Sequence, residues 1–350
     1  MKRRGSVERG GSVERGGSAE RGSAERGGSA SALVAPDSFK GTLSAAEVAE
    51  VVAAGLRDGG VEAVELPVGD GGEGTMDALL AALGGERRAA TAGDPLGRPV
   101  DAEFALIDGG RRAVVEMARA SGLGLVAEDE RDAFAASTRG TGELIAAAAA
   151  AGAEEVVVTV GGSGTTDGGA GALAALDEAG VRPKLTVVCD VRTPWEQAPR
   201  VFGPQKGADP DTVRRLERRL ARLAKAAPRD PRGVPMTGAA GGLAGGLWAH
   251  RGATLVPGAA YVLDAIGFDD HMRAARFVVT GEGRLDRQTL AGKVVFEVAT
   301  RCRQSGVACH AVVGRNELEP FEARLIDLST VTEAGTERRL RGAGRRLAEL

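Results

Sequence analysis

Several short apolar runs in this sequence end in loops made almost entirely of glycine and small polar residues. The run "EEVVVTV" (154–160) leads directly into "VGGSGTTDGGAG" (160–171), which has six glycines among twelve residues. Repeated succession of strand, glycine loop and helix is the pattern of a parallel α/β sheet. Ligands of such sheets gather at the carboxyl ends of the strands, so we expect the functional site in these loops.

The segment that starts at residue 32 has this organisation. "ALVA" (32–35) predicts a strand, and apolar residues at helical spacing follow as far as the stop at Gly59. Thr42 or Ser44 can cap that helix, and Glu47 stands in the capping-box position relative to Ser44. The stretch "VEAVELPVGDGGEGT" (61–75) then predicts a second strand and a second glycine loop, before another helix.

The pattern changes at residue 87. Residues 87–118 contain short strands joined by "DPLG" and "DGG" turns, which predict an antiparallel meander, whereas the chain after residue 272 returns to alternating strand and helix. The predicted fold class is therefore α/β with two domains. Residues 32–86 together with 272–350 are expected to form a Rossmann-like domain with a parallel sheet. Residues 87–271 are expected to form an inserted mixed α/β domain.

Residues 1–31 have a different composition from the rest. The unit "GSVERG" repeats from Gly5, so that glutamate and arginine alternate among glycine and serine. Such a segment has no apolar face whose burial could offset an ordering entropy of about 1–2 kcal/mol per residue. We expect a disordered low-complexity tail with no part in the chemistry.

Composition narrows the classes of partner. The 350 residues carry a formal net charge of −3, which favours neither nucleic acid nor an anionic membrane but leaves small anionic ligands open. The three cysteines are too few for a disulfide framework and lack zinc spacing, which is typical of a reducing cytoplasm. No apolar run approaches the length of a membrane span, and no export signal is indicated. The expected location is cytoplasmic, as a monomer or homodimer.

The loop "GGSGTTDGG" (161–169) has the composition of a phosphate-binding turn. Glycines allow several backbone N–H groups to point at one spot, and a following helix N-terminus favours an anion. The loop matches neither the P-loop pattern nor the dinucleotide-binding fingerprint. On its own, this weak signal favours a simple tight turn over a phosphate site.

Six clusters of this kind occur, and together they point to phosphoryl transfer. They are "APDSFKGT", "GDGGEGT", "GGSGTTDGG", "CDV", "FGPQKGA" and "TGEGRLD", and each has a carboxylate or a cation at a predicted strand end. Phosphoryl transfer requires carboxylates for Mg²⁺, lysine and arginine for the phosphate oxygens, and a base that orients the attacking hydroxyl. The clusters supply all three.

These motifs also resemble a known family. The blocks "APDSFKGTLSA", "DGGEGTMDAL", "DPLGRPV", "EMARASGL", "GGSGTTDGGAGAL", "CDV", "VFGPQKGA", "GAAGGL" and "TGEGRLDRQTLAGK" are similar to those of bacterial glycerate kinases of the type-1 class. The resemblance implies ATP-dependent phosphorylation of glycerate, with 2-phosphoglycerate favoured as product. It also implies Mg²⁺ and an active site in a cleft between two α/β domains.

On this resemblance we assign candidate roles. Asp190 is expected to accept or orient the proton of the glycerate hydroxyl, although a structural turn aspartate is the alternative. Lys40 and Lys206 are expected to neutralise the transferring phosphoryl group, and the planar fork of Arg284 is suited to a carboxylate or a phosphate. Asp70 and Asp286 are candidate Mg²⁺ ligands. The candidate substrate- and phosphate-binding residues are Asp37, Ser38, Gly71, Gly72, Gly161, Gly162, Ser163, Asp167, Gly281 and Glu282.

Two alternatives stay open at this point. The segment between the "GGAGAL" helix and the "CDV" strand is shorter than family members usually have, so the substrate could be another small hydroxy acid. A protein that binds a nucleotide or an acidic metabolite without catalysis is the second alternative. An excess of carboxylates speaks against it, because they repel an anionic ligand unless a metal intervenes.

Overall fold

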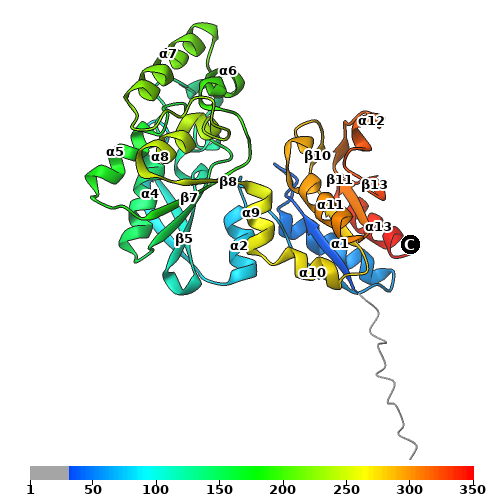
Figure 1. The fold of residues 1–350 in the computed structure, drawn as a ribbon. Helices are drawn as coiled ribbons and strands as arrows, with labels where there is room; N and C mark the ends of the chain where they lie inside the picture. Colours follow the sequence, from blue (N-terminus) through cyan, green and yellow to red (C-terminus); the bar gives the residue numbers. More distant parts are fainter. Residues whose placement is uncertain (1–30) are drawn as a thin grey trace, which may run out of the picture.

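The computed structural model describes residues 31–350, so the predicted disorder of the N-terminal tail lies outside the described residues except for Ser31. The structure has two large sheets and a small two-stranded one, with helices around and between the large sheets (Figure 1). A mixed α/β architecture was expected, and this expectation is confirmed.

The first sheet combines the two ends of the described chain. All of its neighbouring strands are parallel. Its strand order is β13 (Thr330–Glu333), β11 (Cys309–Val313), β9 (Val278–Gly281), β1 (Ala32–Pro36) and β2 (Ala63–Glu65). The helices that accompany it are α1 (Ala45–Asp58), α11 (Val294–Ser305), the short α12 (Pro320–Ala323) and α13 (Glu337–Leu347), and β10 (Arg284–Leu285) pairs with β12 (Arg315–Asn316) beside it.

Local sequence explains the ends of these elements. The predicted capping box of α1 is present, because Ser44 N–H donates to Glu47 Oε2 and Glu47 N–H donates to Ser44 Oγ, and the helix ends at Gly59. Strand β2 is shorter than predicted. Hydrogen bonds to β1 nevertheless continue from Leu66 N–H to Val34 O and from Val68 N–H to Pro36 O, and Pro67 lies between these donors on an edge strand, where proline is tolerated.

The second sheet is built from the middle of the chain. Its strand order is β3 (Glu86–Gly93), β4 (Pro99–Ile107), β5 (Arg112–Glu116), β6 (Glu155–Thr159), β7 (Lys184–Cys189) and β8 (Thr254–Pro257). The β3–β4–β5 part is the predicted antiparallel meander, and β5 to β8 are parallel. Its helices are α3 (Ala118–Ser121), α4 (Arg139–Ala150), α5 (Ala170–Glu178), α6 (Ala198–Phe202), α7 (Pro210–Ala226) and α8 (Leu243–Arg251).

Three further helices lie between the sheets (Figure 1). They are α2 (Thr75–Leu83), α9 (Gly258–Ala265) and α10 (Phe268–Ala274). Helix α2 packs against β4, β5 and α9, while α9 and α10 also pack against α11 of the first sheet. One apolar cluster accordingly contains Leu33 of β1, Val262 of α9 and Val188 of β7. Residue 272, the predicted start of the C-terminal part, lies inside α10, and the division into domains stays a prediction.

Candidate active site

The carboxyl ends of four strands carry the polar residues that the sequence analysis selected. Asp37 follows β1 and Glu282 follows β9, which are neighbours in the first sheet. Gly161 follows β6 and Asp190 follows β7, which are neighbours in the second sheet. Adjacent parallel strands place their carboxyl ends side by side, so each sheet contributes two functional loops to one region.

The two glycine loops touch each other through their backbones. Gly161 N–H donates to Gly71 O over 3.1 Å. A Cβ on Gly161 would lie 2.5 Å from Gly72 Cα and 3.3 Å from Asp190 Oδ2, a separation at which real side chains do not fit. The near absence of side chains in "VGGSGTTDGGAG" therefore allows one loop to pack directly on the other and on Asp190.

A pair of buried carboxylates lies at this junction. Asp70 Oδ1 accepts a hydrogen bond from Gly72 N–H at 2.9 Å, whereas Oδ2 is buried without a hydrogen-bond partner and has Lys40 Nζ at 3.6 Å. Burial and then the charge of Asp70 raise the pKa of Asp37 well above its usual range. Negative charge thus exceeds what Lys40 can neutralise, which is the condition that favours a bound cation.

These two carboxylates fit Mg²⁺. Among residues 31–350, no three histidine, cysteine, aspartate or glutamate side chains come close enough to hold a metal by themselves. Magnesium is usually held by one or two carboxylates together with water and substrate phosphates, so an incomplete protein site suits it. Asp286, the other predicted ligand, is only half-buried, whereas Asp37 is buried and lies close enough to Asp70 for the charge of Asp70 to raise its pKa. These properties favour Asp37 as the partner of Asp70.

Asp190 has the properties of a proton acceptor. Burial, and secondly the charge of Asp70, raise the pKa of Asp190 to about 6, while Lys40 acts in the opposite direction. At pH 7 the carboxylate is therefore mostly ionised but more basic than an ordinary aspartate. General bases are most effective when their pKa lies near the working pH.

Three adjoining cavities surround these groups. The apolar cavity, about 550 Å³, is lined by Leu43, Ala46, Val68 and Ala78 among others. The cationic cavity, about 500 Å³, has Lys40, Arg284, Lys293 and Arg315 in its wall, with Glu282 and Asp286. The Asp190 cavity, about 430 Å³, is lined by Asp190, Ser163, Glu73 and Arg131 among others.

Shared residues join the three cavities. Asp37, Ser38 and Lys40 line both the apolar and the cationic cavity. Glu73 and Gly162 line both the apolar and the Asp190 cavity. The structure thus brings most of the predicted site residues to one place, around Lys40 and Asp190. Gly281 is different: its missing Cβ leaves room for Val312 O of β11, so it serves the packing of the first sheet.

The structure gives two predicted contact residues other uses. Lys206, predicted to touch the phosphoryl group, is buried, and its Nζ donates to Ser163 Oγ at 2.8 Å and to Thr165 O at 2.6 Å. Burial lowers the pKa of Lys206 to about 7. These hydrogen bonds connect Lys206 to the glycine loop and point to a positioning role, while its contact with the phosphoryl group stays a prediction.

Asp167, predicted to bind substrate or phosphate, is occupied within the protein. Its carboxylate accepts hydrogen bonds from the backbone of Thr138, Gly169 and Gly171, and from Thr138 Oγ1. These donors belong to the N-terminal ends of α4 and α5. The geometry indicates that Asp167 fastens the two helices together, because a carboxylate at helix N-termini satisfies otherwise unpaired N–H groups.

Comparison with known proteins agrees with this arrangement. A model of the glycerate kinase family matches residues 32–183 and 177–338. The chain belongs to the glycerate kinase family. Glycerate 2-kinase of Escherichia coli K12 is 40% identical over 306 residues, covering 76% of this chain and 80% of that protein. Glycerate kinase of Bacillus subtilis is 40% identical over 324 residues, covering 81% of this chain and 84% of that protein.

A solved structure extends the likeness to the fold. Glycerate kinase 2 from Salmonella typhimurium LT2 superposes with a TM-score of 0.78 at 32% identity, covering 92% of this chain and 98% of that chain. The chain is therefore an enzyme of the glycerate kinase type, and the non-catalytic binder considered above is set aside. Among the described residues, no helix combines the length and apolarity that a membrane crossing requires.

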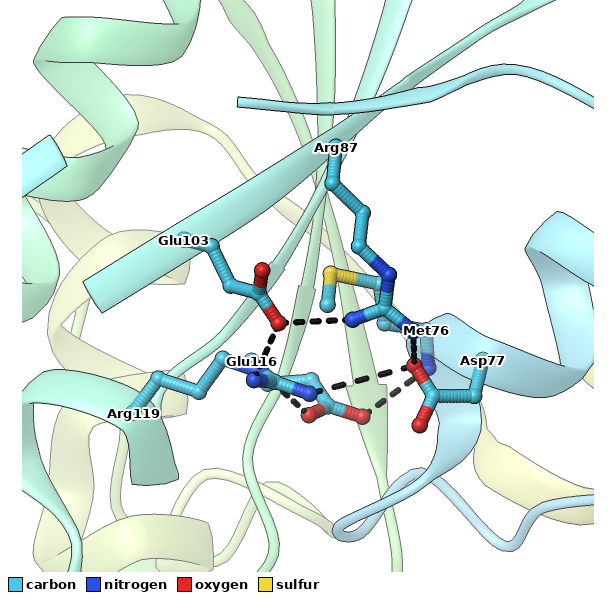
Figure 2. Close-up of polar contacts among 6 residues, drawn as sticks. All are labelled: Met76, Asp77, Arg87, Glu103, Glu116 and Arg119. Carbon is cyan, nitrogen blue, oxygen red and sulfur yellow. Dashed lines mark hydrogen bonds and ion pairs between the residues drawn. The ribbon is translucent and has the colours of Figure 1, made fainter. Parts of the chain in front are cut away.

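The residues that anchor α2 were not among those predicted from the sequence. Glu116 at the end of β5 is buried and accepts a hydrogen bond from Met76 N–H at 2.9 Å, while Arg119 Nε donates to Glu116 Oε2 (Figure 2). Arg87 links Asp77 to Glu103 in the same network. Gly74, the N-cap of α2, has no side chain, so Glu116 satisfies an N–H group at the start of that helix.

A signal for this network was present in the sequence. The block "EMARASGL" was quoted as a family motif, and it contains both Glu116 and Arg119. Nothing in the block itself shows that its glutamate reaches a helix that begins 41 residues earlier in the chain. The pairing depends on where β5 and α2 lie in the fold.

Gly161→Ala tests the contact between the glycine loops. Because the added Cβ meets backbone atoms of Gly72, the loops must separate, and we expect kcat to fall roughly tenfold, since a displacement of less than 1 Å at a reacting group has effects of this size. Steady-state kinetics and a thermal melt measure it. Gly342→Ala is the matched control, because its Cβ meets only Arg346 at 3.6 Å. Equal kinetics for the two variants would show that close packing of the loops is unimportant.

Proposed function

We propose that this enzyme transfers the γ-phosphoryl group of ATP to a hydroxyl of glycerate, with 2-phosphoglycerate as product, in the cytoplasm. The observation that carries the proposal is the meeting of the three cavities around Lys40 and Asp190. A kinase needs a site for the nucleoside, a site for the phosphates and a site for the acceptor that converge at the transferring phosphorus.

Each cavity matches one part of this requirement. The apolar side chains of the apolar cavity suit an adenine ring. Lys40, Arg284, Lys293 and Arg315 of the cationic cavity suit the phosphates. The Asp190 cavity would then hold the acid, with Asp190 facing its hydroxyl.

The reaction follows from these positions. The hydroxyl oxygen of the acid attacks the γ-phosphorus, the bond from phosphorus to the β–γ bridging oxygen breaks, and ADP leaves. Asp190 takes the proton of the hydroxyl, and Lys40 offsets the charge on the transferring group. Mg²⁺, held by Asp70 and Asp37, would supply further neutralisation of the phosphate oxygens.

An ADP-release assay with MgATP and a panel of hydroxy acids tests the proposal. Glycerate should give the highest kcat/KM of the panel, and ³¹P and ¹³C spectra of the product should identify the 2-phosphate. A different acid with a higher kcat/KM would assign the enzyme to that acid, the outcome that the shortened middle segment makes relevant. A 3-phosphate product would correct the position of transfer.

Asp70→Asn tests the metal site. Replacing a buried charged ligand by an amide should raise the Mg²⁺ concentration for half-maximal rate by about tenfold or more, at fixed ATP, because it removes charge that attracts the cation. Asp286→Asn is the matched comparison and should change the Mg²⁺ dependence far less, since Asp286 is half-exposed whereas Asp70 is buried. A larger effect for Asp286→Asn would restore the pairing expected from sequence.

A further inference from the structure

The Asp190 cavity contains an unexplained cation. Arg131 lines this cavity together with Asp190, Ser163 and Gln205. None of the sequence motifs includes Arg131, which follows the acidic run "EDE" in a loop between two predicted elements. The short 3₁₀ turn Glu128–Glu130 ends at Arg131, which continues in extended backbone.

Arg131 has hydrogen-bonding capacity that the protein does not use. Its Nε is buried and has no hydrogen-bond partner. Other arginines of this region are engaged with carboxylates: Arg98 pairs with Asp94 and Glu130, and Arg119 pairs with Glu116 and Glu103. A buried donor without a partner costs about 1–3 kcal/mol, so its presence in a cavity wall indicates a ligand that supplies the acceptor.

The charges that line the Asp190 cavity also indicate a ligand that accepts hydrogen bonds from Arg131. Its two acidic lining residues, Asp190 and Glu73, would repel the carboxylate of a hydroxy acid. Arg131 is the one cation among the described residues in its wall. A guanidinium presents N–H groups in a planar fork that matches the two oxygens of a carboxylate.

The surroundings hold Arg131 in place. The loop after the short helix Pro204–Lys206 packs on its backbone, because a Cβ on Gly207 would lie 3.0 Å from both Arg131 Cβ and Arg131 O. Arg131 and Lys206 also line one small enclosed space below the glycine loop. A fixed backbone limits the reach of the guanidinium to the neighbourhood of Ser163 and Asp190.

We propose that Arg131 binds the carboxylate of the acid substrate and thereby selects hydroxy acids over uncharged polyols. Held by its carboxylate at Arg131, the acid would direct a hydroxyl toward Asp190, which lines the same cavity. This inference rests on the proposed function, because it assigns the Asp190 cavity to the acceptor. The inference adds to that function the residue that recognises the carboxylate of the substrate.

Kinetics of Arg131→Met test the inference. The KM for glycerate should rise about 10- to 100-fold, the range for loss of a hydrogen-bonded charge partner, while the KM for ATP stays within about twofold. The preference for glycerate over glycerol, which has CH₂OH in place of the carboxylate, should shrink by the same factor. Arg131→Lys should fall between wild type and Arg131→Met, because it retains the charge but loses the fork.

Controls separate this role from a structural one. Arg182→Met, at an exposed arginine far from the cavity wall, should leave both KM values unchanged. Added guanidinium ion should partly restore the glycerate KM of Arg131→Ala, which a merely structural defect would not allow. An unchanged preference for glycerate over glycerol in Arg131→Met and Arg131→Lys would overturn the inference, as would a rise confined to the KM for ATP.

Failure of the proposed function has a different signature. In that case wild type releases no ADP with glycerate. The wild-type enzyme would then be tested with the rest of the hydroxy acid panel, and the acid that it accepts would replace glycerate in the comparison. Should Arg131→Met not fold, as judged by a thermal melt, the result for Arg131→Lys decides.

Discussion

Asp190→Asn should lower kcat by at least about 10²-fold while the KM for ATP and the melting temperature change little. The amide keeps the size of the side chain but removes the charge and most of the basicity, and loss of a general base typically costs 10²- to 10⁴-fold. The melt should not fall, because burial already opposes the charged form of Asp190 and raises its pKa to about 6.

Three outcomes of this experiment are distinguishable. A rise in the KM for the acid with kcat preserved would make Asp190 a binding residue. A parallel loss of activity and melting temperature would make it a structural turn aspartate, the alternative considered from sequence. Asp101→Asn, at an exposed position of strand β4, serves as the control and should behave as wild type.

Lys206→Met should lower kcat by roughly 10²-fold although Lys206 touches the protein and not the proposed substrate. Without the ammonium group, Ser163 Oγ and Thr165 O lose their donor, and the glycine loop loses the group that holds it against Asp190. Small displacements near reacting atoms have effects of this size. Lys184→Met, which removes an exposed lysine paired with Glu155, is the control and should retain full activity.

The same variant makes a prediction about pH and stability. The pKa of Lys206 is about 7 in the folded protein and about 10.5 in the unfolded chain, so the unfolded state binds more protons between these values. The free energy of unfolding of wild type should therefore rise relative to that of Lys206→Met between pH 7 and pH 10.5, by a total on the order of 5 kcal/mol.

Below pH 7 the difference between the two proteins should be constant, because both states of Lys206 are protonated there. Denaturant unfolding of wild type and variant at several pH values measures this difference and cancels all other titrating groups. A difference that stays constant from pH 7 to pH 10 would show that Lys206 keeps an ordinary pKa. That result would contradict the burial of its ammonium group in the folded protein.

Local signals in the sequence predicted much of the fold. The capping box of α1, the meander β3–β4–β5 and the alternation of strand and helix depend on residues close together in the chain. The clustering of Asp37, Lys40, Asp70 and Asp190 was also predictable, because each follows a strand whose carboxyl end faces the site.

The sequence does not reveal contacts that depend on distant partners. Lys206 and Asp167 have the residue types of a phosphate site, but their hydrogen bonds to the glycine loop and to Thr138 exist only in the folded protein, and their predicted contact with substrate stays a prediction. Arg131 lies in no motif, and its proposed importance comes from the cavity that it lines together with Asp190. The residue types therefore predicted the region of the candidate site, whereas the contacts of the individual side chains are visible only in the structure.

The anchoring of α2 determines how the site responds to any movement of the two sheets. Glu116 and Arg87 tie α2, and with it the loop that contains Asp70, to the second sheet, although this segment follows directly on β2 of the first. Lys40 follows β1 and belongs to the first sheet. The ion pair between Lys40 and Asp70, at 3.6 Å, therefore connects the first sheet to a loop that is anchored on the second. A hinge motion between the two sheets would first change the distance between these two charges.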